Sequence, residues 1–237
     1  MIQITFIIPT IGRTSLKNTI QSLLSQTNPQ WRAIIVFDGI PCNLDISTLD
    51  PRIQVLESEK KGKEINSAGN VRNYGIRHAT TEWIGFVDDD DILSTRYVDT
   101  FLQEIINFET DVLIFRMYNK NPSHLHPDIF ILPELTTGNF YVQKTGISFA
   151  LKKSLFGGDE NIWFQPHVEE DYQLLNQLRS LSKTIMISPF IRYFVRGCDD
   201  IIMEEFTSDI IIGNRVIIKC NKAFVSYSST GLSSVYV

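Results

Sequence analysis

Four consecutive carboxylates, Asp88–Asp91, end a short apolar run that begins at Trp83. The run is typical of a buried strand, and like charges at the end of such a strand repel one another without a counter-charge. A divalent cation suits this position, because carboxylate oxygens are the ligands that Mg²⁺ and Mn²⁺ prefer. The alternative is a solvated turn that caps the next helix, since acidic residues are also common at helix starts.

A second acidic group, Glu169–Asp171, directly precedes a series of leucines. The spacing of Leu174, Leu175 and Leu178 predicts a helix whose first turn carries the acids. Acids in a first turn interact favourably with the helix dipole, so a purely structural role is one interpretation of this segment. The other interpretation is a second chemical site, distant from Asp88–Asp91 in the sequence.

The elements that must position these carboxylates alternate between strands and helices. We expect strands at residues 2–8, 31–37, 52–56, 83–87, 111–118 and 184–194, and a strand pair within 140–151. Apolar residues at helical spacing predict helices near residues 16–24, 71–79, 97–105 and 171–181. This order predicts an α/β fold in which helices cover a parallel sheet.

Several polar residues follow the ends of the predicted strands. Ligands of an open α/β sheet bind at the carboxyl ends of its strands. Thr10, Asp38 and Asp88–Asp91 all follow such ends, so we expect them to lie together. Pro9 is predicted to end the first strand, because proline cannot donate a hydrogen bond to a neighbouring strand.

The helix predicted near residues 71–79 contains features that favour close contacts. Gly69 and Gly75 lower the stability of a helix, so we expect them to permit the close approach of another backbone or of a ligand. Arg72 and Asn73 form a pair that suits an anion and a hydroxyl group if they face the edge of the sheet. A surface arginine is the alternative interpretation of Arg72.

The composition excludes several classes of protein. The net charge of -5 and the pI near 5.4 argue against a nucleic-acid partner. Three widely spaced cysteines match neither a disulfide framework nor a zinc site and fit a reducing compartment. No leader precedes the first strand, and no apolar run approaches the ~18–20 residues that span a bilayer. We therefore expect a soluble, cytoplasmic protein with at most peripheral membrane contact.

Four segments, in this order, resemble a family 2 glycosyltransferase of the GT-A fold, and the likeness covers residues 2–196. They are Ile7–Thr10 with the helix through Leu24–Thr27, then Phe37–Gly39, then Ala68–Ile76 followed by Trp83–Asp91, and finally Glu170–Tyr172. The resemblance implies a Rossmann-like, mostly parallel sheet flanked by helices in a domain of residues 1–197. Residues 198–237, rich in Ile, Val and Ser, would form a small C-terminal extension packed on that domain as strands or as a helix and a hairpin.

The resemblance also implies a nucleoside-diphosphate sugar as donor. Asp38 would bind the nucleobase of this donor, and Asp88 with Asp89 would approach the ribose. The loop after the first strand and a nearby helix would complete the pocket. The residues implied there are Pro9, Thr10, Arg13 and Arg72.

The remaining acids would take part in the reaction itself. Asp88 and Asp90 match the family's Asp-x-Asp signature and would hold Mn²⁺ or Mg²⁺ against the diphosphate. Asp171 would be the general base, and Glu170 a supporting acid on the acceptor side. One base without a covalent nucleophile implies inversion at the anomeric carbon. The absence of membrane helices indicates a non-processive enzyme that adds one sugar.

The acceptor would be a glycan, a glycolipid or a glycoprotein, and Trp163 and His167 are candidates to contact it. Many relatives carry a histidine after the last core strand, whereas Phe190–Gly197 has none, so Arg196 is a candidate to meet the diphosphate instead. Two other functions stay open. One is a nucleotidyltransferase, for which Pro9–Arg13 is a poor glycine-rich phosphate loop, and the other is an inactive nucleotide-sugar-binding module.

Overall fold

A computed structural model describes residues 3–61, 68–119, 131–133, 145–158, 161–167, 169–181 and 183–195, and the backbone of three further strands within 215–236. Its helices are α1 (Leu16–Leu24), α2 (Gly69–His78), α3 (Tyr97–Asn107) and α4 (Glu170–Ser180). Its strands are β1 (Ile4–Thr10), β2 (Trp31–Asp38), β3 (Ile53–Ser58), β4 (Trp83–Phe86), β5 (Ile92–Leu93), β6 (Val112–Asn119), β7 (Ile131–Leu132), β8 (Phe149–Lys152), β9 (Ile185–Val195), β10 (Arg215–Lys219), β11 (Ala223–Ser228) and β12 (Gly231–Tyr236).

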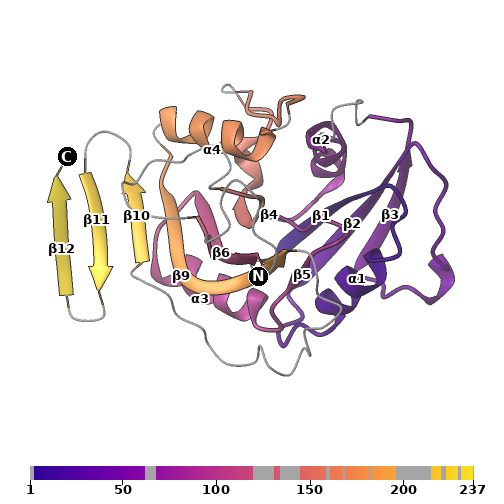
Figure 1. The fold of residues 1–237 in the computed structure, drawn as a ribbon, viewed down its shortest axis with the longest axis horizontal. Helices are drawn as coiled ribbons and strands as arrows, with labels where there is room; N and C mark the ends of the chain where they lie inside the picture. Colours follow the sequence, from indigo (N-terminus) through magenta and orange to yellow (C-terminus); the bar gives the residue numbers. More distant parts are fainter. Residues whose placement is uncertain are drawn as a thin grey trace.

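The N-terminal half of the sheet is parallel, as its alternating strands and helices predict. The order is β3-β2-β1-β4, and β1 lies between its two parallel partners. All residues of β1 are buried, because helices cover both faces of the sheet. Figure 1 shows α2 and α4 on one face and α1 and α3 on the other. The α/β prediction is therefore confirmed.

The strand β1 is longer than predicted, and the prediction that Pro9 ends it is wrong. Pro9 pairs with Val36 and Thr10 with Phe37, so the strand continues to Thr10. On the other side, pairing with β4 ends at Ile7, whose carbonyl accepts from Val87. In a parallel strand, the N–H groups of alternate residues point to the same neighbouring strand, so an N–H on Pro9 would point to the same side as that of Ile7, toward β4. Pairing with β4 has already ended there, so the proline costs the sheet no hydrogen bond.

The second half of the sheet is mixed. The strand β8 is antiparallel to both β4 and β6, and β6 is parallel to β9. Two register shifts around Arg116 bend this pairing, and Figure 1 shows β9 as a strongly curved strand. Because of this curvature, the end of β9 reaches β5, where Tyr193 pairs with Leu93 directly after the acidic residues. Of the strand pair predicted within 140–151, residues 140–144 lie outside the described residues.

The C-terminal strands extend the sheet. The strand β10 pairs antiparallel with β9, and β11 and β12 follow as a meander. Figure 1 shows these three strands at one edge of the molecule. Strands are thus confirmed within residues 215–236, while the domain boundary near residue 197 stays a prediction.

Two glycines of α2 permit the close packing that the sequence predicts. A Cβ atom on Gly75 would lie 2.6 Å from Cγ2 of Ile7 on β1. A Cβ atom on Gly69 would lie 2.9 Å from Cβ of Phe164 and 3.2 Å from the carbonyl oxygen of Gln165. Larger side chains at these positions would push α2 away from the sheet and from the segment before α4. The predicted close approach of another backbone is confirmed at Gly69, whereas Gly75 makes room for side chains of β1 and β2.

Candidate active site

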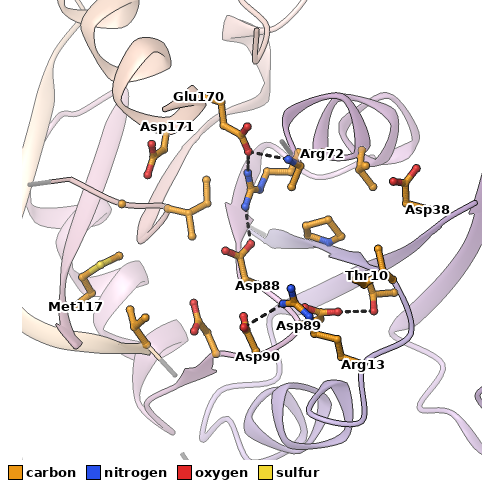
Figure 2. A pocket seen from close by; sticks show the side chains of 18 of the residues that line it. Thr10, Arg13, Asp38, Arg72, Asp88, Asp89, Asp90, Met117, Glu170 and Asp171 are labelled. Carbon is orange, nitrogen blue, oxygen red and sulfur yellow. Dashed lines mark hydrogen bonds and ion pairs between the residues drawn. The ribbon is translucent and has the colours of Figure 1, made fainter. Parts of the chain in front are cut away.

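A cavity of about 400 Å³ opens at the carboxyl ends of β1, β2 and β4 (Figure 2). This volume is within the range of small-molecule sites. The cavity brings together the two acidic groups, which are far apart in the sequence. Its lining includes Pro9, Thr10, Arg13, Asp38, Arg72, Asp88, Asp89, Asp90, Asp91, Glu170 and Asp171.

Arg13 and Thr10 hold the centre of the acidic turn. The Oγ1 atom of Thr10 donates to Oδ2 of Asp89 at 2.6 Å. Nη1 of Arg13 lies 2.9 Å from Oδ1 of Asp89 and 3.0 Å from Oδ2 of Asp90. Burial raises the pKa of Asp89, although the Thr10 hydroxyl and the Arg13 charge oppose this effect. Both carboxylate oxygens of Asp89 thus bond to other residues of the protein, whereas the side chain of Asp90 remains 24% exposed at the cavity.

Arg72 joins the two acidic groups. Its Nη2 atom donates to Oδ1 of Asp88 at 2.5 Å, and its Nη1 atom donates to Oε1 of Glu170. The same oxygen of Glu170 accepts from the backbone N–H of Ala68 at 3.1 Å. Burial lowers the pKa of Arg72, but the charges of Asp88 and Glu170 outweigh it and the net pKa is raised. Arg72 is therefore a permanently charged, buried bridge between β4 and α4, not a surface arginine.

Glu170 and Asp171 have different environments despite being neighbours. Glu170 is buried and bonded to Arg72 and Ala68. Asp171 is half-buried at the cavity, and its Oδ1 atom accepts from the Tyr172 backbone N–H at 2.7 Å. Burial raises the pKa of Asp171 to about 6, against the opposing effects of that hydrogen bond and of the Arg72 charge. A carboxylate with a pKa near neutrality suits a general base, and the assignment of this role to Asp171 stays a prediction.

Asp38 lies at the end of the cavity opposite Asp171, as Figure 2 shows. Its side chain is 4% exposed, and its Oδ2 atom lies 3.0 Å from Nζ of Lys60. Its Oδ1 atom accepts from the backbone N–H of Lys61 at 2.5 Å. Both donors are directed at the carboxylate of Asp38, so they hold this buried acceptor in place at the end of the cavity.

Asp91 has a different environment from its three acidic neighbours. Its Oδ2 atom accepts from the hydroxyl of Tyr193 at 2.7 Å. Burial, followed by the charges of Asp91 and Asp88, holds the pKa of Tyr193 well above its ordinary value, so the hydroxyl remains a donor. The sequence pattern around Asp88–Asp91 contains no signal for this contact, because the curvature of β9 produces it.

Trp163 and His167 lie outside the lining of the cavity. The Trp163 indole donates to Oδ1 of Asn161 at 3.0 Å and packs on Phe156, while Arg77 covers its ring. His167 is exposed, and its Nδ1 atom accepts from the backbone N–H of Glu169 at 3.1 Å. Their contact with an acceptor stays a prediction, and Arg196 lies outside the described residues.

The cavity also contains residues that the motifs did not single out. Lys60 comes from a charged loop, Met117 from β6, Val195 from the end of β9, and Gly146 and Ile147 from the loop before β8. Only the charge of Lys60 could have marked it in the sequence, since apolar residues at strand ends resemble the core. Ile11 also lines the cavity, in the loop after β1 that was predicted to do so.

The fold is that of a GT-A glycosyltransferase domain. The model of glycosyl transferase family 2 matches residues 5–163, more than half of the chain, and the protein belongs to this family. Family membership favours the transferase prediction over the nucleotidyltransferase alternative.

Two curated relatives come from Streptococcus pneumoniae. The glycosyltransferase GlyG is 30% identical over 143 residues, which are 58% of this chain and 42% of GlyG. The glycosyltransferase GlyA is 28% identical over 128 residues, which are 51% of this chain and 18% of GlyA. The chain thus matches less than half of the length of either relative.

Solved structures of TarS from S. aureus share the fold. TarS superposes with a TM-score of 0.62 at 18% identity, covering 83% of this chain and 37% of TarS. Residues 1–349 of TarS, in complex with UDP-GlcNAc, give a TM-score of 0.61 at 16% identity and cover 88% of this chain and 62% of that fragment.

None of the helices in the described part of this chain has the length and apolar character needed to cross a membrane.

Proposed function

We propose that this protein transfers one sugar from a nucleoside-diphosphate sugar to an acceptor hydroxyl in glycan assembly. The observation that carries the proposal is the arrangement of a single cavity. A buried acceptor, Asp38, lies at one end and Asp171, with a pKa of about 6, lies at the other (Figure 2). Arg13 and the partly exposed carboxylates of Asp88 and Asp90 lie between them, where a diphosphate would have to pass.

The end of the cavity at Asp38 favours uracil or thymine as the base of the donor. The imide edge of these bases presents acceptor, donor and acceptor in sequence. The carboxylate of Asp38, held by Lys60 Nζ and the Lys61 N–H, would accept from the N–H of that edge. Structures of TarS with UDP and with UDP-GlcNAc support a uridine nucleotide, since this chain shares their fold.

Asp88 and Asp90 have the chemistry to hold Mn²⁺ or Mg²⁺. Both line the cavity and both are partly exposed, with 34% and 24% of the side chain accessible. Within the described ranges, no group of three or more His, Cys, Asp or Glu side chains forms a complete metal site. Two carboxylates nevertheless suit a cation that takes its other ligands from water and from substrate phosphates. When bound, the cation would offset the charge of the leaving diphosphate.

Asp171 would accept the proton of the acceptor hydroxyl. As that oxygen forms its bond to the anomeric carbon, the bond from this carbon to the diphosphate oxygen breaks, and the nucleoside diphosphate leaves with the electron pair. The proton moves to the Asp171 carboxylate, which is the available base above a pH of about 6. A single displacement of this kind inverts the anomeric configuration. Glu170 and Arg72 would act together by holding α4 against the acidic turn.

The test is a donor screen with Mn²⁺ and a panel of UDP-, GDP- and dTDP-sugars, in which the released nucleoside diphosphate is measured with and without EDTA. We expect release from a uridine or thymidine donor, loss of release with EDTA, and loss in Asp90→Ala. Asp171→Asn should keep donor binding and lose roughly 10²–10⁴-fold in turnover, the usual contribution of a general base. Glu169→Gln is the matched control, because this neighbouring acid lies outside the cavity lining.

Calorimetric titration with the free nucleoside diphosphates separates a missing acceptor from a wrong assignment. Binding of UDP without turnover would direct the search to the acceptor. If none of the nucleotides binds in the presence of Mn²⁺, the donor site at Asp38 is excluded.

A further inference from the structure

The fourth carboxylate of the acidic turn, Asp91, has no part in the proposed reaction, yet its contacts define the shape of the turn. Its backbone N–H donates to the carbonyl oxygen of Asp88 at 3.1 Å, which closes the turn. Its side chain is buried, unlike those of Asp88 and Asp90. Asp91 therefore borders the cavity with its side chain bonded to the protein, whereas the side chains of the two candidate metal ligands are partly exposed.

One hydroxyl group contacts both ends of this turn. The Tyr193 hydroxyl donates to Oδ2 of Asp91 at 2.7 Å and accepts from the backbone N–H of Asp88 at 3.2 Å. Tyr193 is fully buried and lies on β9, more than 100 residues further along the chain. Its position is set by the pairing of Tyr193 with Leu93 and of Phe194 with Ile92, which join β9 to the two residues that follow the turn.

A second hydroxyl, from a different element, contacts the same turn. Thr19 of α1 is fully buried, and its Oγ1 atom lies 2.8 Å from the carbonyl oxygen of Asp91 and 3.3 Å from that of Asp88. Tyr193 thus contacts the turn from β9, and Thr19 contacts it from α1. Both ends are held from two sides, and Asp90 lies between them.

We propose that Tyr193 is a positioning residue of the active site, whose hydroxyl, through Asp91 and the Asp88 N–H, sets the orientation in which Asp88 and Asp90 meet a divalent cation and the donor diphosphate. This inference rests on the proposed function. Contacts that orient metal ligands from behind typically change metal affinity by about 10–100-fold when they are removed. Asp91 is then the anchor of the acidic turn and not a ligand.

The test compares two isosteric substitutions of buried tyrosines. Tyr193→Phe removes the hydroxyl and keeps the ring. Tyr97→Phe is the matched control, because Tyr97 is also fully buried but its hydroxyl has no hydrogen-bond partner in the described part of the chain. Mn²⁺ binding is measured by the electron paramagnetic resonance signal of free Mn²⁺, with and without UDP, and thermal unfolding is recorded for each variant.

We expect Tyr193→Phe to bind Mn²⁺ with UDP at least tenfold more weakly than the unmodified protein, whereas Tyr97→Phe binds it unchanged. Thr19→Val should weaken binding in the same direction, which gives a second variant if Tyr193→Phe does not fold. Equal Mn²⁺ affinity in Tyr193→Phe and the unmodified protein, even with a lower melting temperature, would overturn the inference and leave Tyr193 a stability residue. If the unmodified protein itself binds no Mn²⁺ with UDP, it is the proposed function that fails.

Discussion

Two arginines in the same cavity each contact two carboxylates, and their surroundings are opposite. The side chain of Arg72 is 5% exposed and joins Asp88 to Glu170, whereas that of Arg13 is 41% exposed and joins Asp89 to Asp90. Arg72 also lies over the ring of Phe164, at 5.6 Å from its centroid. The chemistry of the two groups is alike, so burial is the variable that separates them.

Burial determines what each arginine can do. Removing Arg72 would leave the buried carboxylate of Glu170 without its counter-charge, which costs far more than the ion pair contributes. Arg13 and Asp90 keep access to water, so their ion pair has little net stability and can be exchanged. The comparison assigns Arg72 to the framework that connects β4 with α4, and Arg13 to contacts that a bound diphosphate can replace.

The largest effect is expected when the buried bridge is broken. Arg72→Met keeps the aliphatic stem against Phe164 but removes the charge from Asp88 and Glu170. We expect it to lower the free energy of unfolding by about 3–5 kcal/mol, the usual cost of leaving one buried partner unpaired. Urea denaturation measures this change. Arg13→Met provides the matched control, and equal losses in the two variants would show that burial does not separate the arginines.

A smaller effect, with a defined pH dependence, is expected at Asp171. Its pKa is raised from 3.8 to about 6 in the folded state, so the folded protein binds this proton more tightly than the unfolded chain. The resulting stabilisation is complete below pH 3.8 and is lost as the pH rises through about 6. A shift of this size corresponds to about 3 kcal/mol.

Asp171→Asn therefore should be more stable than the unmodified protein at pH 7.5, by up to about 3 kcal/mol, and nearly equal to it at pH 4. Denaturation at the two pH values measures the difference. The same residue should give turnover that rises with pH through about 6. A stability difference that does not change with pH would contradict the assignment of a burial-raised pKa to Asp171.

The smallest effect on stability is expected at Arg13. Arg13→Met should lower the free energy of unfolding by less than Arg72→Met does, because Arg13 is 41% exposed and the buried carboxylate of Asp89 keeps the hydroxyl of Thr10 as a donor. Its affinity for UDP should nevertheless fall, since the cavity loses a cation where the diphosphate is proposed to lie. Calorimetry at low and at higher salt measures this loss, which should be larger at low salt. Unchanged UDP affinity would remove Arg13 from the proposed donor site.

Much of the fold followed from local patterns, as did one group of the predicted cavity residues, while the resemblance to a family implied the others. Apolar runs and helical spacing located the main strands and the four helices, and polar residues at strand ends predicted that Thr10, Asp38 and Asp88–Asp91 lie together. The prediction that Pro9 ends the first strand was wrong for a tertiary reason. Whether a proline ends a strand depends on which neighbouring strand its missing N–H would face, and the sequence does not give this. Residues such as Met117 and Ile147 could not be recognised, because a pocket wall and a core look alike in sequence.

The chain alone specified which chemical groups are available: two acidic clusters, two arginines, and glycines that let α2 approach β1 and the segment before α4. Residue types and their local spacing contain this information, because it does not depend on long-range contacts. Only the tertiary structure decided how the groups differ. Burial made Arg72 a bridge and Arg13 an exchangeable ion pair, separated Glu170 from Asp171, and brought Tyr193 of β9 against the acidic turn. These distinctions depend on desolvation and on contacts between distant segments, which no single segment of the sequence encodes.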